Sequence, residues 1–331
     1  MDDDSSRRPL PPSPSPARPG SGDRRGGRLL RLLPAASLAL AALVALPPAA
    51  MAQQDLDVPY VPTPPEVVSQ MLEMARPASG DTVYDLGSGD GRIVITAAER
   101  YGTPGVGVEL DSGRVATARQ NAAEAGVSDL VRFVRGDLFE ADVSAANVVT
   151  LYLFPGVNRK LRPMLYEQLD PGDRVVSHDF NMGDWSADSV VNMDRRDGGS
   201  STVYLWVMPV NVGGTWRLTL PGDRGVRVRL DQRYQEFRAT FPEAPGGQVT
   251  GTRVRGDTVR FTLRGVVDDD PLRFTGTVED GRMEGTTSLG DPWSARRLSA
   301  DGDSSILGWE ETSGGEAGSE SGGDTGGGSG P

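Results

Sequence analysis

Three glycines separated by single residues form the most informative segment of the chain. They are Gly87, Gly89 and Gly91, within the run Asp85-Leu86-Gly87-Ser88-Gly89-Asp90-Gly91-Arg92. Glycine lets the backbone turn sharply and come close to a ligand. The run follows an apolar, strand-like stretch and precedes a helical one, which is the context that a nucleotide-binding glycine loop requires. We therefore expect a cofactor loop here.

Two carboxylates narrow the class of ligand. Asp85 lies at the end of the expected strand and Asp90 lies inside the loop. Both would repel the pyrophosphate of a dinucleotide. The same carboxylates suit a ligand with an ammonium or a sulfonium group, and S-adenosylmethionine carries both.

Acidic residues also follow the next two strands. Glu109 comes 24 residues after Asp85, near the roughly 20-residue offset of a ribose-binding carboxylate. Asp137 follows the third strand, where it can accept a hydrogen bond from an adenine amino group. Each one alone could be a solvated carboxylate at a strand end. Together with the loop they predict a cofactor site, because ligands bind at the carboxyl ends of strands in such sheets.

The elements that would position these residues alternate between strand and helix from residue 53 to about 209, which is typical of an α/β parallel sheet. We expect strands over 82–86, 105–110, 130–134, 146–153 and 174–177, and a closing hairpin over 190–193 and 203–207. Helices are expected over 92–101, 112–125 and 158–169, and in a first helix capped by Thr63 with Pro64 or Pro65 in its first turn. The predicted fold is a Rossmann-like sheet of seven strands.

The remainder of the chain is different in character. Residues 210–299 show short alternating strands separated by turn residues, which predicts a small antiparallel all-β domain, either a barrel or a meander. Residues 300–331 form a Gly/Ser-rich acidic tail, too polar to fold alone. In residues 1–52, arginines precede an apolar run over 35–46 and an Ala-Met-Ala sequence, which is typical of a signal peptide. We expect an exported protein, or one tethered by an uncleaved N-terminal anchor. A third interpretation is that the start of the coding sequence is wrongly assigned.

A family resemblance rests on these motifs. The segment 85–92 looks like the first motif of class I S-adenosylmethionine-dependent methyltransferases. More narrowly, the chain resembles the seven-strand protein-lysine methyltransferases that include the ATP synthase c-subunit lysine methyltransferase. The matching segments are PYVPTP (59–64), DLGSGDGRIVITAA (85–98), GVEL (107–110), LYLFP (151–155) and RVVS (174–177). The resemblance covers about residues 57–208.

The resemblance implies methyl transfer from S-adenosylmethionine, with Asp85, Gly87 and Gly89 at the methionine end, Glu109 at the ribose and Asp137 at the adenine. The expected cofactor-binding residues are Thr63, Asp85, Gly87, Ser88, Gly89, Asp90, Glu109, Asp137 and Leu138. The implied acceptor is a protein lysine or, with less support, a small molecule. Membrane and envelope proteins are the acceptors to search first.

Aromatic residues near the strand ends are candidates for the acceptor site. Methyl transfer to lysine needs a neutral amine, which desolvation and aromatic faces favour. Tyr152 and Phe154 follow the fourth strand, and Trp185 follows the fifth; these three are the expected catalytic residues. Tyr60 is a further candidate to line the substrate site. His178 could act as a base, although a histidine at a strand end is more often structural.

Composition excludes other chemistries. The 331 residues contain no Cys and one His, so a disulfide framework, a cysteine nucleophile and a multi-histidine metal site are excluded, and we expect no metal. A net charge of −12 argues against a nucleic-acid partner. The rival hypothesis is an exported binding protein that keeps the fold without turnover, although the loop glycines and Glu109 are present. Asp90 and a poor match to G-x-G-x-x-G disfavour a dehydrogenase.

Overall fold

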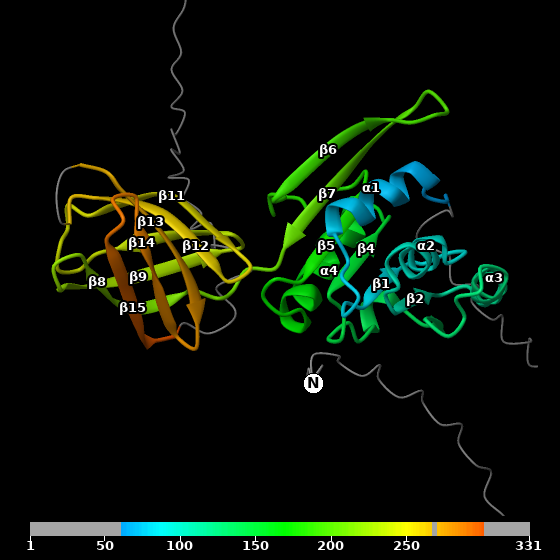
Figure 1. The fold of residues 1–331 in the computed structure, drawn as a ribbon, viewed down its shortest axis with the longest axis horizontal. Helices are drawn as coiled ribbons and strands as arrows, with labels where there is room; N and C mark the ends of the chain where they lie inside the picture. Colours follow the sequence, from blue (N-terminus) through cyan, green and yellow to red (C-terminus); the bar gives the residue numbers. More distant parts are fainter. Residues whose placement is uncertain (1–60, 267–269, 301–331) are drawn as a thin grey trace, which may run out of the picture. The chain divides into compact units, whose positions relative to one another are not determined.

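The computed structural model describes residues 61–266 and 270–300. The expected leader, Tyr60 and the tail beyond residue 300 lie outside the described residues. Figure 1 shows the chain as a ribbon with its elements labelled. Within the described ranges, no helix is both long and apolar enough to cross a membrane.

The N-terminal half forms the expected α/β sheet. Its elements are α1 (Pro65–Ala75), β1 (Val83–Leu86), α2 (Arg92–Tyr101), β2 (Gly105–Glu109), α3 (Ser112–Glu124), β3 (Val131–Arg135), the short 3₁₀ turn η1 (Leu138–Glu140), β4 (Val148–Leu151), α4 (Pro155–Gln168), β5 (Arg174–His178), β6 (Ser189–Asp194) and β7 (Ser200–Val207). The strand order is β3-β2-β1-β4-β5-β7-β6. The prediction of a seven-stranded Rossmann-like sheet is confirmed.

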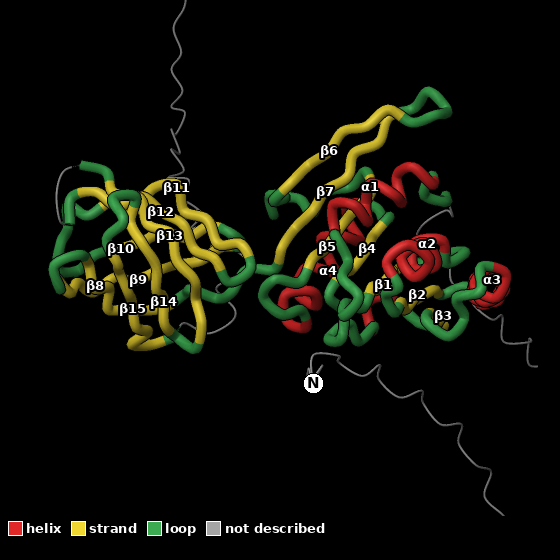
Figure 2. The backbone as a smooth tube through the Cα atoms, viewed as in Figure 1, coloured by secondary structure: helices red, strands yellow, loops and turns green. Residues whose placement is uncertain are grey.

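The direction of the strands follows from their pairing. β1 pairs in parallel with β2 and β4, and β2 pairs in parallel with β3. Asp179 N–H donates to Thr202 O, and Met208 N–H donates to Asp173 O. Residue numbers thus rise along β5 as those of the bonded residues fall along β7, so β7 is antiparallel to β5. β6 and β7 form the expected hairpin (Figure 2).

Burial explains why the central strands form where they do. Every residue of β1, β2 and β4 is buried, as expected for parallel strands covered on both faces. The amphipathic helix α2 begins after Gly91 and ends before Gly102, and both glycines have a positive φ. A glycine in this conformation ends a helix without a steric cost.

Two expectations about helix starts were wrong. Thr63 does not cap α1, because Pro64 is the N-cap residue and no side chain caps the helix. The Thr63 hydroxyl instead lies 3.3 Å from His178 Nδ1. α4 begins at Pro155, earlier than expected, and contains Pro163.

Residues 214–299 form the predicted antiparallel all-β structure. Its strands are β8 (Gly214–Leu220), β9 (Arg224–Arg233), β10 (Glu236–Thr240), β11 (Gln248–Arg255), β12 (Thr258–Arg264), β13 (Leu272–Glu279), β14 (Arg282–Thr287) and β15 (Pro292–Ser299). The order β10-β9-β8-β15-β14-β13-β12-β11 pairs the first strand with the last. Gln235 O accepts from Val254 N, and Thr252 Oγ1 accepts from Phe237 N. The meander therefore nearly closes into a barrel, with a seam between β10 and β11.

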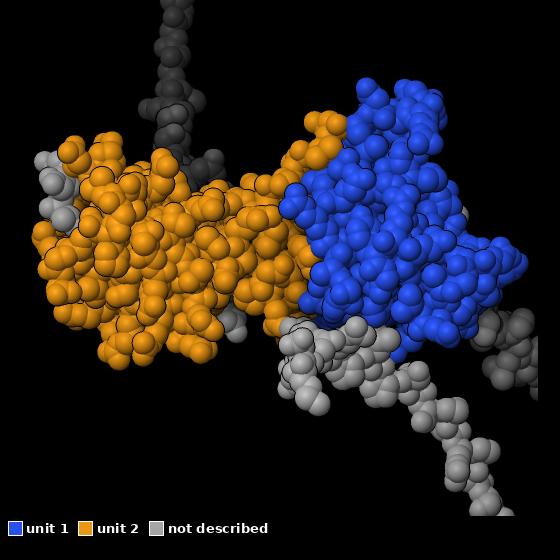
Figure 3. Space-filling model, viewed as in Figure 1, with its two compact units in different colours: residues 1–157, 177–180, 193–203 blue, residues 158–176, 181–192, 204–331 orange. Residues whose placement is uncertain are grey.

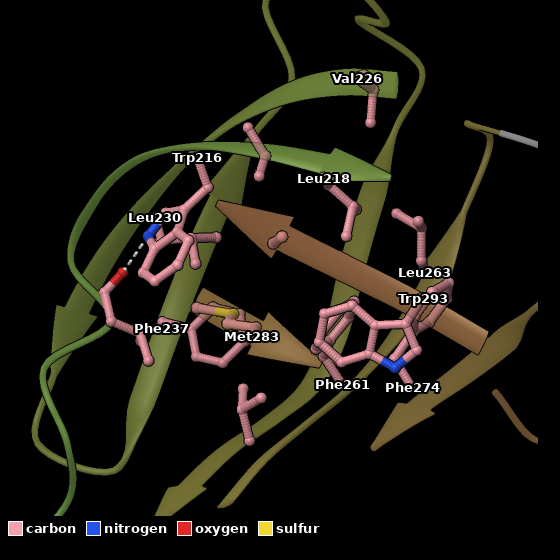
Figure 4. Packing of buried hydrophobic residues seen from close by; sticks show 14 of the residues in the cluster. Trp216, Leu218, Val226, Leu230, Phe237, Phe261, Leu263, Phe274, Met283 and Trp293 are labelled. Atoms are coloured by element: carbon pink, nitrogen blue, oxygen red, sulfur yellow. Dashed lines mark hydrogen bonds between the residues drawn. The ribbon is translucent and has the colours of Figure 1, made fainter. Parts of the chain in front are cut away.

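The barrel interior is apolar and rich in aromatic residues (Figure 4). Phe261 and Phe274 stack at a centroid distance of 4.8 Å, and Trp293 meets both rings edge-on. The Trp216 indole N–H donates to Val212 O, so this buried ring leaves no polar group unpaired.

The chain divides into two compact units (Figure 3), and the boundary between these units does not coincide with the boundary between the two sheets. The first unit comprises residues 1–157, 177–180 and 193–203, and the second comprises 158–176, 181–192 and 204–331, each as far as it is described. Within the second unit, the buried side chain of Asp188 accepts from Val207 N and from Gln235 Nε2, and pairs with Arg253. Residues before the barrel thus share a polar network with barrel residues.

Gly107 provides a test of packing in β2. A Cβ at Gly107 would lie 2.6 Å from Phe133 Cδ1 and 2.6 Å from Ser88 Oγ. We expect Gly107→Ala to lower the free energy of unfolding by about 1–3 kcal/mol, because the core must shift to admit the methyl group. Urea denaturation measures this change. Gly80→Ala, where a Cβ would have nothing within 4 Å, is the matched control. Equal midpoints for the two variants would contradict the packing argument.

Candidate functional site

The predicted site residues gather at the carboxyl edge of the parallel strands. Asp85 lies in β1, Glu109 is the last residue of β2, and Asp137 follows β3. Tyr152 follows β4, and its ring stacks on His178, the last residue of β5, at a centroid distance of 3.9 Å. One edge of the sheet therefore carries both the acidic and the aromatic candidates.

The glycine loop makes a tight turn directly after β1. Gly87, Gly89 and Gly91 have φ angles of 81°, 53° and 81°, a conformation that side chains rarely adopt. The amides of Gly87 and Ser88 both donate to Val108 O, at 2.9 and 3.0 Å. The loop is thereby bonded to the neighbouring strand β2.

Glu109 holds this loop from the side. Its Oε2 accepts from Gly89 N at 2.9 Å, and its Oε1 accepts from Asp111 N at 3.0 Å. The residue is 6% exposed, and Arg114 Nη1 lies 3.8 Å from Oε1. Each carboxylate oxygen can accept more than one hydrogen bond, so Glu109 keeps capacity for the hydroxyls of a ligand.

Asp85 is a buried carboxyl. Its Oδ1 accepts from Thr150 Oγ1 at 2.7 Å, because Thr150 is opposite Asp85 in the β1–β4 register. Burial raises the pKa of Asp85 to about 7; the Thr150 hydrogen bond opposes this rise, and Glu109 and Asp90 add to it. A cationic ligand group would favour the ionised form.

Asp90 and Thr63 are engaged within the chain. Arg92 Nε donates to Asp90 Oδ1 at 2.9 Å, and Arg92 Nη1 donates to Thr63 O at 2.9 Å. Arg92 thus connects the loop to the segment before α1. These contacts give each residue a partner in the protein, and the expectation that both residues bind the cofactor stays a prediction.

Ser88, Asp137 and Leu138 complete the predicted cofactor set. Ser88 is buried, and among the described residues its hydroxyl has no hydrogen-bond partner. Asp137 is exposed, and its Oδ1 accepts from Phe139 N at 2.9 Å. Leu138, which begins η1, is half-buried. An unpaired buried hydroxyl, spare carboxylate lone pairs and a loop of glycines fit a ligand with ammonium and diol groups.

Aromatic rings line the edge after β4 and β5. Phe180 lies 6.1 Å from the Tyr152 ring and 5.7 Å from the Phe154 ring. Phe154 is 40% exposed, and burial raises the pKa of the Tyr152 hydroxyl. The three rings with His178 form an aromatic edge that can desolvate an amine.

His178 is a buried, neutral ring. Its Nδ1 faces Thr63 Oγ1, and its Nε2 lies 2.9 Å from Ser201 Oγ. Burial lowers the pKa of His178 to about 4, against the opposing effect of the Asp179 carboxylate. His178 Nε2 also lies 3.2 Å from Asp179 Oδ2. Because protein side chains engage both nitrogens and the ring stacks on Tyr152, the structural interpretation is favoured over a base.

Trp185 is a core residue, contrary to its prediction as a catalytic residue of the acceptor site. It is 1% exposed, and its Nε1 donates to Gln235 Oε1 at 2.7 Å. The ring stacks on Tyr234 at 5.2 Å and contacts Tyr166 at 4.9 Å. Both the apolar ring and its single polar atom are therefore satisfied by packing within the second unit.

Sequence reasoning missed Thr150, Phe180 and Ser201. Thr150 was the detectable one, since it is a polar residue in an apolar strand that pairs with the strand of Asp85. Ser201 had no local signal, because its contact with His178 joins residues 23 apart in the chain.

Known proteins resemble the part of the chain that carries this edge. A family model described as an ANTKMT methyltransferase domain matches residues 85–189. A protein-lysine N-methyltransferase of Saccharolobus islandicus is 46% identical over 153 residues, which cover 46% of this chain and 94% of that protein. An adenine nucleotide translocase lysine N-methyltransferase of Mus musculus is 36% identical over 159 residues, which cover 48% of this chain and 66% of that protein.

Among solved structures, an RNA methyltransferase from Salinibacter ruber in complex with S-adenosyl-L-homocysteine is 58% identical. The match covers 46% of this chain and 96% of that chain, with a TM-score of 0.44. The family-model match ends at residue 189, before the first barrel strand.

The raised pKa of Asp85 predicts a pH dependence of stability. In the unfolded chain the pKa of an aspartate is about 3.9, whereas burial raises the pKa of folded Asp85 to about 7. Between these values the folded state holds a proton that the unfolded state has released, so stability falls as pH rises. Asp85→Asn removes this effect. We therefore expect the free energy of unfolding of the variant, relative to that of wild type, to rise by about 2 kcal/mol between pH 5 and pH 8.

Urea denaturation at several pH values measures the Asp85 effect. Asp129→Asn, on an exposed turn, is the matched control and should follow the wild-type profile. Parallel profiles for wild type and Asp85→Asn would show that Asp85 does not hold the extra proton.

Proposed function

Because the chain belongs to the protein-lysine N-methyltransferase family, we propose that it methylates a lysine side chain of an acceptor protein. The observation that carries this proposal is the 46% identity to an archaeal protein-lysine N-methyltransferase across 94% of that protein. The chain is an S-adenosylmethionine-dependent methyltransferase, and S-adenosylmethionine is its cofactor. When bound, this cofactor supplies a methyl group on a positively charged sulfur.

We assign the cofactor contacts to the edge after β1, β2 and β3. Glu109 is placed to accept from the ribose hydroxyls while it holds Gly89. We assign Asp85 to the ammonium group and Gly87, Gly89 and Ser88 to the methionine end. We assign Asp137 and Leu138 to the adenine. Asp90 and Thr63 then act as positioning residues through Arg92.

The aromatic edge is our candidate for the acceptor site. A lysine must lose its proton before it can attack, and an apolar surrounding lowers the pKa of its ammonium group. Tyr152 and Phe154 offer ring faces after β4, and Phe180 supports both rings. The main task of these residues is to align the amine with the methyl group, because displacement at carbon depends on orientation.

Glu109→Gln tests the cofactor site in the purified full chain. We expect the affinity for S-adenosylmethionine, measured by calorimetry, to fall by roughly tenfold to a hundredfold, because a charge-assisted hydrogen bond contributes about 1.5–3 kcal/mol. Glu99→Gln, on the exposed end of α2, is the matched control and should bind as wild type does.

The same preparations test the reaction. With methyl-labelled cofactor and protein fractions of the native cells, we expect methyllysine in an acceptor protein, and little with Glu109→Gln. Tyr152→Ala should keep its cofactor affinity and lose turnover. Label recovered in RNA, or a folded protein that does not bind the cofactor, would refute the proposal.

We propose further that the acceptor is a membrane or envelope protein and that the enzyme works outside the cytoplasm, or tethered at the membrane. The support is the sequence of residues 1–52, with its arginines, apolar run and Ala-Met-Ala site. N-terminal sequencing of the protein from fractionated native cells should find an envelope-associated chain that begins at Gln53, or an intact tethered one. A soluble cytoplasmic chain would contradict this assignment.

A further inference from the structure

Four arginines stand side by side across four strands of the barrel. In the antiparallel register Arg227 of β9 is opposite Arg217 of β8, Arg217 is opposite Arg296 of β15, and Arg296 is opposite Arg282 of β14. All four side chains are exposed. Because adjacent strands lie about 4.8 Å apart, this arginine row is about 15 Å long.

The arginine row costs stability unless an anion binds it. Like charges directly opposite each other on neighbouring strands are destabilising. Acidic residues stand at the ends of the row: Glu243 lies 3.7 Å from Arg227, and Glu279 is opposite Arg282 in the register. Glu284 is opposite Ser294 on the same face, two residues from Arg282 along β14. Among the described residues, neither Arg217 nor Arg296 forms an ion pair with any of these carboxylates.

The residues around the row suit an anionic ligand. On the same outer face, Thr215 and Thr219 flank Arg217, and Ser294 is opposite Thr219. A Cβ at Gly225 would lie 2.8 Å from Arg217 Nη2, so the absence of a side chain at Gly225 leaves room for this guanidinium group to lie across β9. Guanidinium groups beside hydroxyls recognise carboxylates through paired hydrogen bonds.

We propose that the arginine row binds the acidic C-terminal segment of the same chain, residues 301–331. This segment contains seven carboxylates and no basic residue: Asp301, Asp303, Glu310, Glu311, Glu316, Glu320 and Asp324. One residue, Ala300, separates it from the end of β15, and Arg296 of the row precedes Asp301 by five residues.

Attachment favours this occupant over a separate acidic molecule. A segment joined to the barrel has an effective concentration in the millimolar range, which lets weak ion pairs form. An extended chain covers about 3.3–3.6 Å per residue, so the segment can follow the row along its whole length. Any external anion must displace it first.

A photo-crosslinker on the tail tests this contact in the full chain. The protein has no Cys of its own, so Ser319→Cys can carry a benzophenone at a single position. We expect crosslinks to peptides of β8, β9, β14 and β15, with a yield that falls in high salt because the contact is electrostatic. Arg217→Gln with Arg296→Gln should abolish these crosslinks, whereas the matched pair Arg260→Gln with Arg264→Gln on β12 should retain them.

A second variant leaves the barrel untouched. Replacing the seven tail carboxylates with amides should abolish the same crosslinks. The arginine pair loses both the repulsion within the row and the ion pairs with the tail, so its urea midpoint should stay close to that of wild type and show that the variant folds. Crosslinks that persist in either variant, or that spread evenly over the chain, would overturn the proposal. So would covalent dimers whose yield grows with protein concentration, because they would place the tail on a second copy. None of these outcomes bears on methyl transfer.

Discussion

The carboxylate of Glu109 is the interaction on which the site depends. It stands at the end of β2 and accepts from the amide of Gly89 in the loop after β1. A loop of three glycines would otherwise have a wide choice of conformations, and ordering such a loop costs entropy. By accepting this hydrogen bond, Glu109 holds the loop after β1 against the end of β2. The same carboxylate stands where a ligand hydroxyl would meet it, so loop conformation and ligand binding share one group.

Local signals predicted the sheet well. The helix after the glycine loop occupies the expected residues 92–101, because Gly91 and Gly102 bracket it on both sides. The central strands were readable because burial on both faces makes their sequences mostly apolar. The short alternating strands expected within residues 210–299 were also found, since one buried face imposes alternation on the sequence of a barrel strand.

Side-chain partners were harder to predict than elements. The acidic candidates came together because parallel strands share an edge, which is a property of topology. Thr63 was expected to cap a helix and instead meets His178, which is 115 residues away. Trp185 was expected at the acceptor site and is a core residue, because its partners Tyr234 and Gln235 come from a region with no sequence signal of contact. Contacts of this range depend on packing that no local pattern contains.

Pairing of the first barrel strand with the last has a consequence for the order of folding. β8 and β15 are bonded along their length, although their paired residues are about eighty residues apart in the chain. The edge of β8 stays open until β15 is synthesised and returns to it, and contacts of such separation form slowly. By contrast, the bonds of β1 to β2 and β4 involve residues nearer in the chain. During synthesis the α/β elements can assemble first, and the barrel must wait for its last strand.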